Sequence, residues 1–452
     1  MSEPKGRTVG STECSWCKAV QGGTGIAVVA LHTSKPPNIN RLQYALQKLQ
    51  NSHPILKSTL LQHTSTFSFL TSPTPIPILH LTTHDLSSNL NNTDDAVTIS
   101  PLQQILELEL NNDSVWRDAT RNSNKLFFGS VYALPNNVWV IALRLHVAAC
   151  DRTTAVLLLR ELLELMMEEK EEIVSEHQNN DKKVSLAIED LIPREKTKKP
   201  LLARGFDVLS YSLNSFRLTN LKFNDTKTTK FSQVMRLQLN QDDTKGILAG
   251  CAWNEIKVCG VMSAAGLIAA HSSKLGSKKY GIVTLTDCRS TLQSRLSDNF
   301  GFYHSAILNS HEIKGGETLW ELAKKTFGTF ATSKKNNKHF SDMADLNFLM
   351  CKAIENPGLT PSSSLRTAIM SVFEDTVVDN SGKKQREIGV EDYMGSSVHG
   401  VGPSIAIFDT IRDGCFDCIF VYPAPLHSRE QMQDIVGKMR STLIDAAKTY
   451  KE

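Results

Sequence analysis

The sequence predicts an α/β protein built from two halves, each large enough for its own core. Three observations support this prediction. Strand and helix patterns alternate along the chain, and a charged stretch at 168–200 interrupts them. The length of 452 residues allows about three domains, so there is room for more than one core. Hydrophobic residues form 40% of the chain and charged residues 21%, an ordinary globular composition that excludes wholesale disorder.

The first half begins with an apolar strand at 25–34. A helix follows, and Asn38 is expected to cap it, because asparagine accepts hydrogen bonds from the free N–H groups that begin a helix. Two β-rich runs at 125–134 and 138–146 are joined by Pro-Asn-Asn, which predicts a hairpin. The half is completed by short strands at 67–71 and 77–81, a helix at 101–110 and a helix entered at Asp151.

The stretch at 168–200 is rich in charge and ends in proline, so we expect an exposed, weakly packed crossover. After it come strands at 230–240, 280–289, 302–308, 404–411 and 415–423, and helices at 258–275, 317–334, 342–355 and 429–448. We therefore place the first half at 1–180, the exposed crossover at 181–205 and the second half at 206–452.

Charge and the chain's beginning exclude several classes of protein. Fifty Lys and Arg against 47 Asp and Glu give a net charge of +3, too small for a basic field that captures nucleic acid or anionic lipid. No run of about 18 apolar residues occurs, so no membrane span is expected. The first residues lack the apolar core of a secretory signal, which makes the cytosol the expected compartment.

The nine cysteines are expected to be free thiols, because their odd number and a cytosolic location argue against disulfides. They include two Cys-x-x-Cys pairs, Cys14 with Cys17 and Cys415 with Cys418. The second pair lies in a predicted strand, where residues three apart point to opposite faces. We therefore expect no metal site.

The segment LRLHVAACDRTT at 143–154 holds the strongest chemical candidate. His146 ends a predicted strand, and a neutral imidazole there can take a proton from a hydroxyl or amine at physiological pH. Asp151 follows at the entry to a helix. From these residues alone two interpretations stay open: a catalytic base, or a buried structural histidine with Asp151 acting only as a helix cap.

Several segments, in order, resemble the CoA-dependent acyltransferase superfamily, which includes plant BAHD acyltransferases, alcohol acetyltransferases and peptide synthetase condensation domains. The first similar segments are a helix with a His-Pro turn at 40–60 and a His-x-x-x-Asp motif at 146–151. The later ones are a helix that opens the second half at 251–270, an Asp-x-Arg stretch with a Phe-Gly turn at 286–307, and a glycine motif at 398–409.

The sequence departs from the superfamily pattern at two motifs. Four residues separate His146 from Asp151 instead of three, and Arg152 replaces the usual glycine. The late motif keeps Gly400 and Gly402 but lacks the aspartate, phenylalanine and tryptophan. Two alternatives therefore stay open: a catalytically silent descendant that binds a metabolite or a partner, and a His-dependent lyase or cyclase on the same fold.

The resemblance implies two chloramphenicol acetyltransferase-like halves of mixed sheet plus helices, with a solvent channel between them and a late segment that completes the first sheet. His146 would be the general base of an acyl-CoA-dependent O- or N-acyltransferase. Asp151 and Arg289 would pair and support the site. Acyl-CoA would be a co-substrate rather than a bound cofactor, the partners would be acyl-CoA and a small-molecule acceptor, and the chain would be a monomer.

Overall fold

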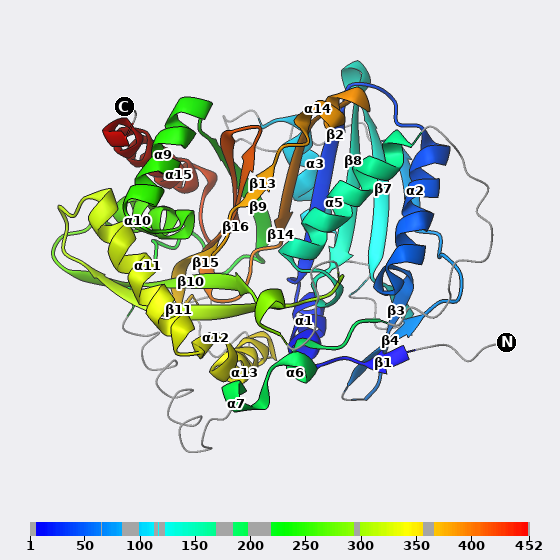
Figure 1. Ribbon diagram of the computed structural model, residues 1–452, viewed down its shortest axis with the longest axis horizontal. Coiled ribbons are helices and arrows are strands. Elements are labelled where there is room, and N and C mark those ends of the chain that lie inside the picture. The colour runs from blue at the N-terminus through cyan, green and yellow to red at the C-terminus, as the bar shows by residue number, and fades with distance from the viewer. Residues whose placement is uncertain are drawn as a thin grey trace. The chain divides into compact units, whose positions relative to one another are not determined.

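The computed structural model describes residues 6–64, 66–83, 99–112, 116, 123–168, 184–197, 218–292, 299–355 and 366–450 (Figure 1). The chain folds into two compact units. Unit 1 holds 1–191, 294–303 and 382–397, and unit 2 holds 192–293, 304–381 and 398–452. Each unit mixes sheet and helix, so the predicted α/β class is confirmed.

Unit 1 is built on a five-stranded sheet in the order β14-β2-β8-β7-β5. The predicted hairpin is confirmed, since β7 and β8 pair antiparallel across the turn Pro135–Asn137. The late strand β14 pairs antiparallel with β2, as the resemblance implied. The bounds are β2 Ile26–Thr33, β5 Leu79–Thr83, β7 Phe127–Leu134, β8 Val138–His146 and β14 Val390–Ser397.

Helices cover both faces of this sheet. Figure 1 shows α2 and α5 on one face and α3 on the other. Asn38 caps α2 as predicted, because its side chain accepts a hydrogen bond from the N–H of Arg41. The bounds are α2 Ile39–Ser52, α3 Pro101–Leu110 and α5 Arg152–Met167.

A smaller antiparallel sheet of unit 1 has the order β1-β4-β3-β6 and lies in the same unit as helix α1. Its strands are short, and the apolar side chains of β3 and β4 join the core of the unit. The bounds are β1 Gly6–Thr8, α1 Ser11–Gln21, β3 Ser58–Gln62, β4 Phe67–Thr71 and β6 Ser123–Lys125.

Unit 2 is built on a sheet in the order β11-β10-β12-β15-β16-β9, with β13 also paired to β15. β10, β12 and β15 run parallel, and the other main pairings are antiparallel. The bounds are β9 Phe231–Gln238, β10 Lys278–Asp287, β11 His304–Ile313, β12 Ala368–Phe373, β13 Val377–Asp379, β15 Pro403–Arg412 and β16 Cys415–Ala424.

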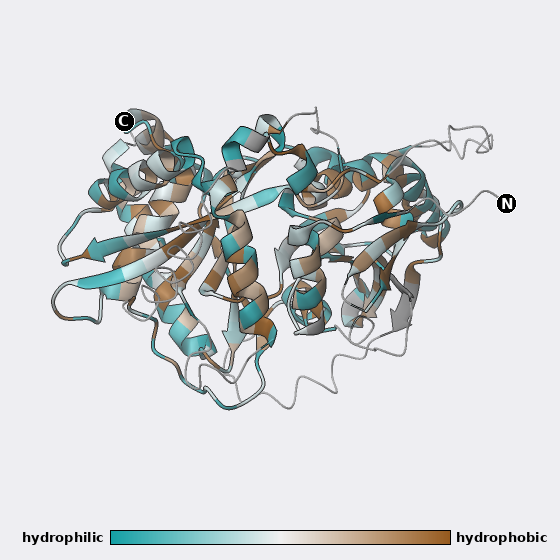
Figure 2. Cartoon of the chain, turned by 90° about the horizontal axis from the view of Figure 1, so that it is seen from below, coloured by the Kyte–Doolittle hydropathy of each residue, from teal (hydrophilic) through white to brown (hydrophobic). Residues whose placement is uncertain are grey.

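The helix α10 is buried almost all round, which fits its apolar sequence and makes it the central helix of unit 2. The helices around it carry apolar residues (brown in Figure 2), and the buried ones among them belong to the core of unit 2. The bounds are α9 Gln241–Trp253, α10 Val258–His271, α11 Leu319–Lys335, α12 Lys338–Ser341, α13 Met343–Glu355 and α15 Arg429–Ala447. None of the described helices is long and apolar enough to cross a membrane.

The prediction of an exposed crossover at 168–200 is wrong for part of that stretch. Helix α6 (Ile188–Leu191) buries Ile188 completely and Leu191 almost completely. The carboxylate of Glu189 accepts hydrogen bonds from Ser11 and Thr12, which ties this helix to α1. A few buried apolar residues inside the charged run therefore hold α6 against the rest of unit 1. Residues 169–183 and 198–200 of the predicted crossover lie outside the described residues.

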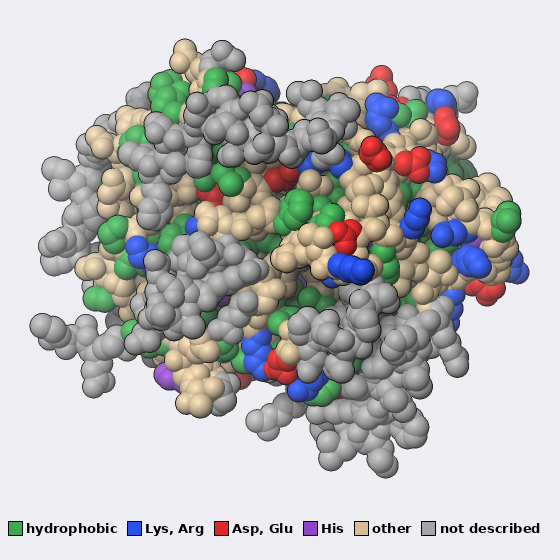
Figure 3. All heavy atoms as spheres, turned by 180° about the vertical axis from the view of Figure 1, so that it is seen from behind, with side chains coloured by type: hydrophobic (Ala, Val, Ile, Leu, Met, Phe, Trp, Pro, Cys, Tyr) green, Lys and Arg blue, Asp and Glu red, His purple; other side chains and the backbone are tan. Residues whose placement is uncertain are grey.

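The charged residues of the described surface are mixed in sign. On the face shown in Figure 3, lysine and arginine side chains are interspersed with aspartate and glutamate side chains. This arrangement agrees with a net charge of only +3. The described surface on this face offers no extended field of one sign.

Candidate active site

His146 is held in place by backbone hydrogen bonds at the end of β8. It lies opposite Ile26 of β2, and its N–H donates to the carbonyl of Leu126 over 2.9 Å. The next N–H, that of Val147, donates to the carbonyl of Gly25 over 2.9 Å. Only 1% of His146 is exposed, so its ring is almost completely excluded from solvent. The backbone hydrogen bonds on both sides of it make the position rigid.

The extra residue between His146 and Asp151 is taken up by a 3₁₀ turn, η5 (Val147–Ala149). The N–H of Cys150 donates to the carbonyl of Val147 over 3.1 Å, which closes the turn. Cys150 itself is buried in the apolar core of unit 1. The longer spacing thus lets the chain pass from β8 into α5 without disturbing either element.

The same turn determines where the imidazole proton lies. The N–H of Ala148 donates to Nδ1 of His146 over 3.1 Å. A neutral ring whose Nδ1 accepts must carry its proton on Nε2. Burial lowers the pKa of His146 to about 3, so the ring is neutral at physiological pH. In this state Nε2 is a hydrogen-bond donor, and it becomes a base only in the other tautomer.

A buried polar cluster lies on the same face of β8 as His146, because residues two apart in a strand share a face. Arg144 donates to Glu109 of α3 over 2.7 Å, and the hydroxyl of Tyr132 donates to the same carboxylate. Burial and this carboxylate raise the pKa of Tyr132. The ring of Trp116 lies 5.4 Å from the Arg144 guanidinium and meets His146 edge-on, with centroids 5.7 Å apart.

Sequence reasoning missed this cluster. Its signals were an arginine inside the apolar strand VWVIALRLH and a glutamate at the buried end of the helix PLQQILELEL. A charge on an otherwise apolar face needs a partner, and each of these residues is the partner of the other. The pairing joins residues 35 positions apart, which local patterns do not reveal.

Asp151 caps helix α5 and joins it to the Phe-Gly turn. One carboxylate oxygen accepts from the N–H of Thr154 and the other from the N–H of Tyr303, both over 2.8 Å. The N–H of Asp151 donates to the carbonyl of Gly301 over 3.1 Å. Asp151 thereby connects the turn after His146 to a segment 150 residues further along the chain.

Three of the segments that carried the resemblance come together here. The ring of His53, from the His-Pro turn, stacks on Phe300 with centroids 3.6 Å apart, and its Nε2 lies 2.7 Å from a carboxylate oxygen of Glu161 in α5. On the other side of the turn, Phe302 packs against Trp16 of α1 at 5.4 Å. The His-Pro turn, the His146 segment and the Phe-Gly turn are thus parts of one packed region of unit 1.

Arg289 begins the short turn η6 (Arg289–Thr291) after β10 in unit 2 and is buried. Its Nη1 lies 3.1 Å from both carboxylate oxygens of Asp287, and its N–H donates to the same carboxylate over 2.9 Å. The predicted pair of Arg289 with Asp151 joins residues of different units and stays a prediction.

Loss of the Asp151 carboxylate is expected to destabilise the protein by about 3 kcal/mol. Asp151→Ala removes a helix cap, worth about 1 kcal/mol, and leaves the buried Tyr303 N–H without this acceptor, worth about 2 kcal/mol. Asp151→Asn keeps one oxygen for the cap and should cost less. Urea unfolding measures both, and equal costs for the two variants would contradict the cap.

The predicted partnership with Arg289 is tested by a double-mutant cycle. If the two side chains interact, Asp151→Ala combined with Arg289→Met should be more stable than the sum of the single changes indicates. Strictly additive losses in unfolding free energy would show that the pair does not form.

Three other histidines of unit 2 lie against identified neighbours. Nδ1 of His271 lies 3.2 Å from the hydroxyl of Tyr280, and Nδ1 of His399 lies 2.8 Å from the hydroxyl of Ser232. His304 meets Phe373 edge-on at 5.7 Å. Within the described ranges, no three His, Cys, Asp or Glu side chains gather so that they could hold a metal ion.

Several solved structures share the fold of this chain. The trichothecene 15-O-acetyltransferase from Fusarium sporotrichioides superposes with a TM-score of 0.73 at 12% identity, over 98% of this chain and 95% of that chain. The cyclization-docking bidomain of the EpoB peptide synthetase from Sorangium cellulosum gives 0.67 at 12% identity, over 98% and 85%. The epimerization domain of tyrocidine synthetase B gives 0.62 at 12% identity, over 99% and 97%.

These likenesses define the class of fold. The chain has the α/β fold of these structures, an acetyltransferase and two peptide synthetase domains, which agrees with the fold that the resemblance implied. A scan against protein-family models and a search of the curated proteins found no match to the sequence. Since one fold can host several reactions, the residues of the site determine which reaction takes place.

Proposed function

We propose that this chain transfers an acyl group from an acyl-CoA thioester to a hydroxyl or amine of a small metabolite, with His146 as general base. The observation that carries the proposal is a neutral imidazole at the end of a rigid strand, in a fold that also serves an acetyltransferase. A base must be neutral before it takes a proton, and burial keeps His146 neutral throughout the physiological pH range.

The proposed reaction needs one proton relay. The acceptor gives its proton to Nε2 of His146 while its oxygen or nitrogen bonds to the thioester carbon. The tetrahedral intermediate then collapses, the bond from carbon to sulfur breaks, and Nε2 returns the proton to the CoA sulfur. No acyl-enzyme forms, and the buried thiol of Cys150 takes no part.

Base catalysis at Nε2 requires a change of tautomer. The ring proton has to move to Nδ1, which breaks the hydrogen bond from the N–H of Ala148. Leaving that buried N–H without an acceptor costs about 1–3 kcal/mol. Burial also disfavours the protonated ring, so the negative charge of the tetrahedral intermediate has to lie close to it. Binding of the substrates would have to offset both the loss of the Ala148 hydrogen bond and the cost of protonating a buried ring.

The tautomer can be observed directly. In the free protein we expect ¹⁵N NMR to show His146 protonated on Nε2, with the signal assigned by its loss in His146→Asn. Addition of acetyl-CoA should move the proton to Nδ1, because the proposed reaction needs a free lone pair on Nε2. A ring that stays protonated on Nε2 in the presence of acetyl-CoA would contradict the role as base.

A catalytically silent descendant is the second candidate. It is favoured by the occupied Nδ1, by the 1% exposure of His146 and by the packing of Trp116 against its ring. These contacts suit a histidine whose role is structural. Such a protein would bind a metabolite or a partner without turnover.

One experiment separates the candidates. The full chain is incubated with radiolabelled acetyl-CoA and a metabolite extract. Acyl incorporation that depends on His146 supports transfer, and saturable binding without turnover supports the silent descendant. Consumption of a metabolite without CoA would instead support a lyase or cyclase. Structures named for epimerization and cyclization on the same fold make this third outcome worth measuring.

A further inference from the structure

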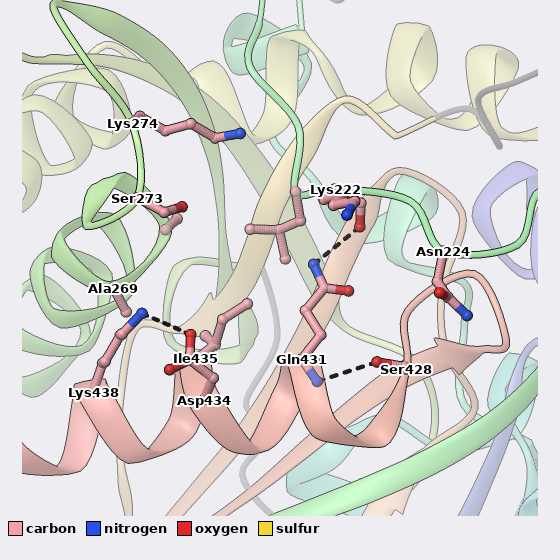
Figure 4. A pocket seen from close by; sticks show the side chains of 12 residues that line it. Lys222, Asn224, Ala269, Ser273, Lys274, Ser428, Gln431, Asp434, Ile435 and Lys438 are labelled. Carbon is pink, nitrogen blue, oxygen red and sulfur yellow. Dashed lines mark hydrogen bonds and ion pairs between the residues drawn. The ribbon is translucent and has the colours of Figure 1, made fainter.

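A cavity of about 250 Å³ opens in unit 2 where α10 ends and α15 begins (Figure 4). Its floor is apolar and buried, and is formed by Leu221, Ala269, Ala270 and Ile435. Its rim carries three lysines, Lys222, Lys274 and Lys438. The cavity therefore combines a surface for a small carbon group with a set of ammonium groups.

The positive charge of the rim is only partly balanced. Asp434 is the one carboxylate among the lining residues, and it lies 2.6 Å from the ammonium group of Lys438. Lys222 and Lys274 form no ion pair within the part of the chain that the structure describes. Three lysines against one aspartate leave two ammonium groups available to a ligand.

The wall that carries Lys222 is anchored from behind. The backbone carbonyl of Lys222 accepts hydrogen bonds from the side chain of Gln431 over 2.9 Å and from Nδ1 of His427 over 3.1 Å. The N–H of Asn224 donates to the carbonyl of Leu426 over 2.7 Å. His427 is completely buried, so these contacts fix the backbone of 222–224 against the start of α15.

We propose that this cavity binds a small phosphomonoester, with the phosphate at Lys222 and Lys274 and the carbon part on the apolar floor. Ammonium groups bind phosphate as compact charges, and two of them match a dianion. A volume below the range of about 300–1,000 Å³ that is typical of drug-sized ligands limits the carbon part to a few atoms or one ring. All these residues belong to unit 2, whereas His146 belongs to unit 1.

The test uses phenyl phosphate as the probe, titrated onto the full chain by calorimetry. It should bind more tightly than inorganic phosphate, because the floor adds apolar contact, and its affinity should fall as sodium chloride is added. Lys222→Gln and Lys274→Gln should each weaken binding about tenfold, the value of one charge-assisted contact. Asp434→Asn should strengthen binding, since it removes a negative charge and releases Lys438.

Lys352→Gln provides the matched control, because Lys352 is an exposed lysine of α13 that pairs with Glu355. It should leave binding unchanged, and thermal melting checks that all variants are folded. The proposal is overturned if the Lys222 and Lys274 variants bind phenyl phosphate as tightly as the wild type. It is also overturned if Lys352→Gln loses as much affinity as they do. Neither result depends on acyl transfer.

Discussion

Replacement of His146 by asparagine is expected to abolish acyl transfer while leaving the protein folded. The asparagine oxygen can take the place of Nδ1 and accept from the N–H of Ala148, so the turn η5 keeps its hydrogen bond. The proton relay through Nε2 is lost. A general base contributes about 10²- to 10⁴-fold, and turnover should fall by that factor.

His146→Ala is the companion variant, and it should lose stability as well as activity. It leaves the buried Ala148 N–H without this acceptor, which costs about 1–3 kcal/mol. Comparison of the two variants separates the chemical role of the ring from its structural role. An asparagine variant that keeps most of the wild-type rate would rule out His146 as the base.

Acid should unfold this protein through its buried histidines. Burial lowers the pKa of five of them: His146 and His399 to about 3, and His311, His339 and His427 to about 4. In an unfolded chain each would titrate near 6.5. Below about pH 6.5 the unfolded state therefore binds more protons than the native state. The free energy of unfolding then decreases as the pH is lowered, until the pH reaches the pKa values of the native state near 4 and 3.

The expected loss is large. Each histidine contributes about 1.4 kcal/mol per pH unit, so the five together contribute up to about 7 kcal/mol per unit. A unit that is stable by about 5–15 kcal/mol should therefore be markedly less stable at pH 5 than at pH 7.5. Urea midpoints measured from pH 7.5 to pH 5 test this slope.

A single variant shows whether the slope belongs to the buried rings. His311→Gln removes one titrating group and should lower the slope by about 1.4 kcal/mol per pH unit. His63→Gln, at an exposed histidine, should leave the slope as it is. Stability that stays constant between pH 7 and pH 5 would contradict the prediction.

Local patterns predicted most of the strands and helices. The apolar strand at 25–34, the hairpin with its Pro-Asn-Asn turn and the cap at Asn38 all appear in the structure. These elements have strong signals within a few residues. In contrast, β12 has six residues that are apolar except for Ser371, and β14 mixes charged and small residues. Neither strand shows the alternation of apolar and polar residues that identifies a half-buried strand.

The candidate site was predicted less completely, because its determinants are tertiary. The sequence indicated His146, but the position of its proton depends on the turn that accommodates the extra residue. Glu109 and Arg144 lie on a helix and a strand that the sequence predicts separately, and only folding joins them. The buried helix α6 was missed for a similar reason, since its few apolar residues lie inside a charged run.

The late strand β14 also bears on synthesis. A ribosome releases β2 (Ile26–Thr33) long before its neighbour β14, which lies at Val390–Ser397. During the intervening elongation one edge of the sheet of unit 1 has open N–H and C=O groups, a template for pairing with another chain. The Phe-Gly turn at 299–303, which receives Asp151, is also late. A nascent chain would therefore need chaperone protection until β14 has been made, and a fragment that ends before β14 should aggregate.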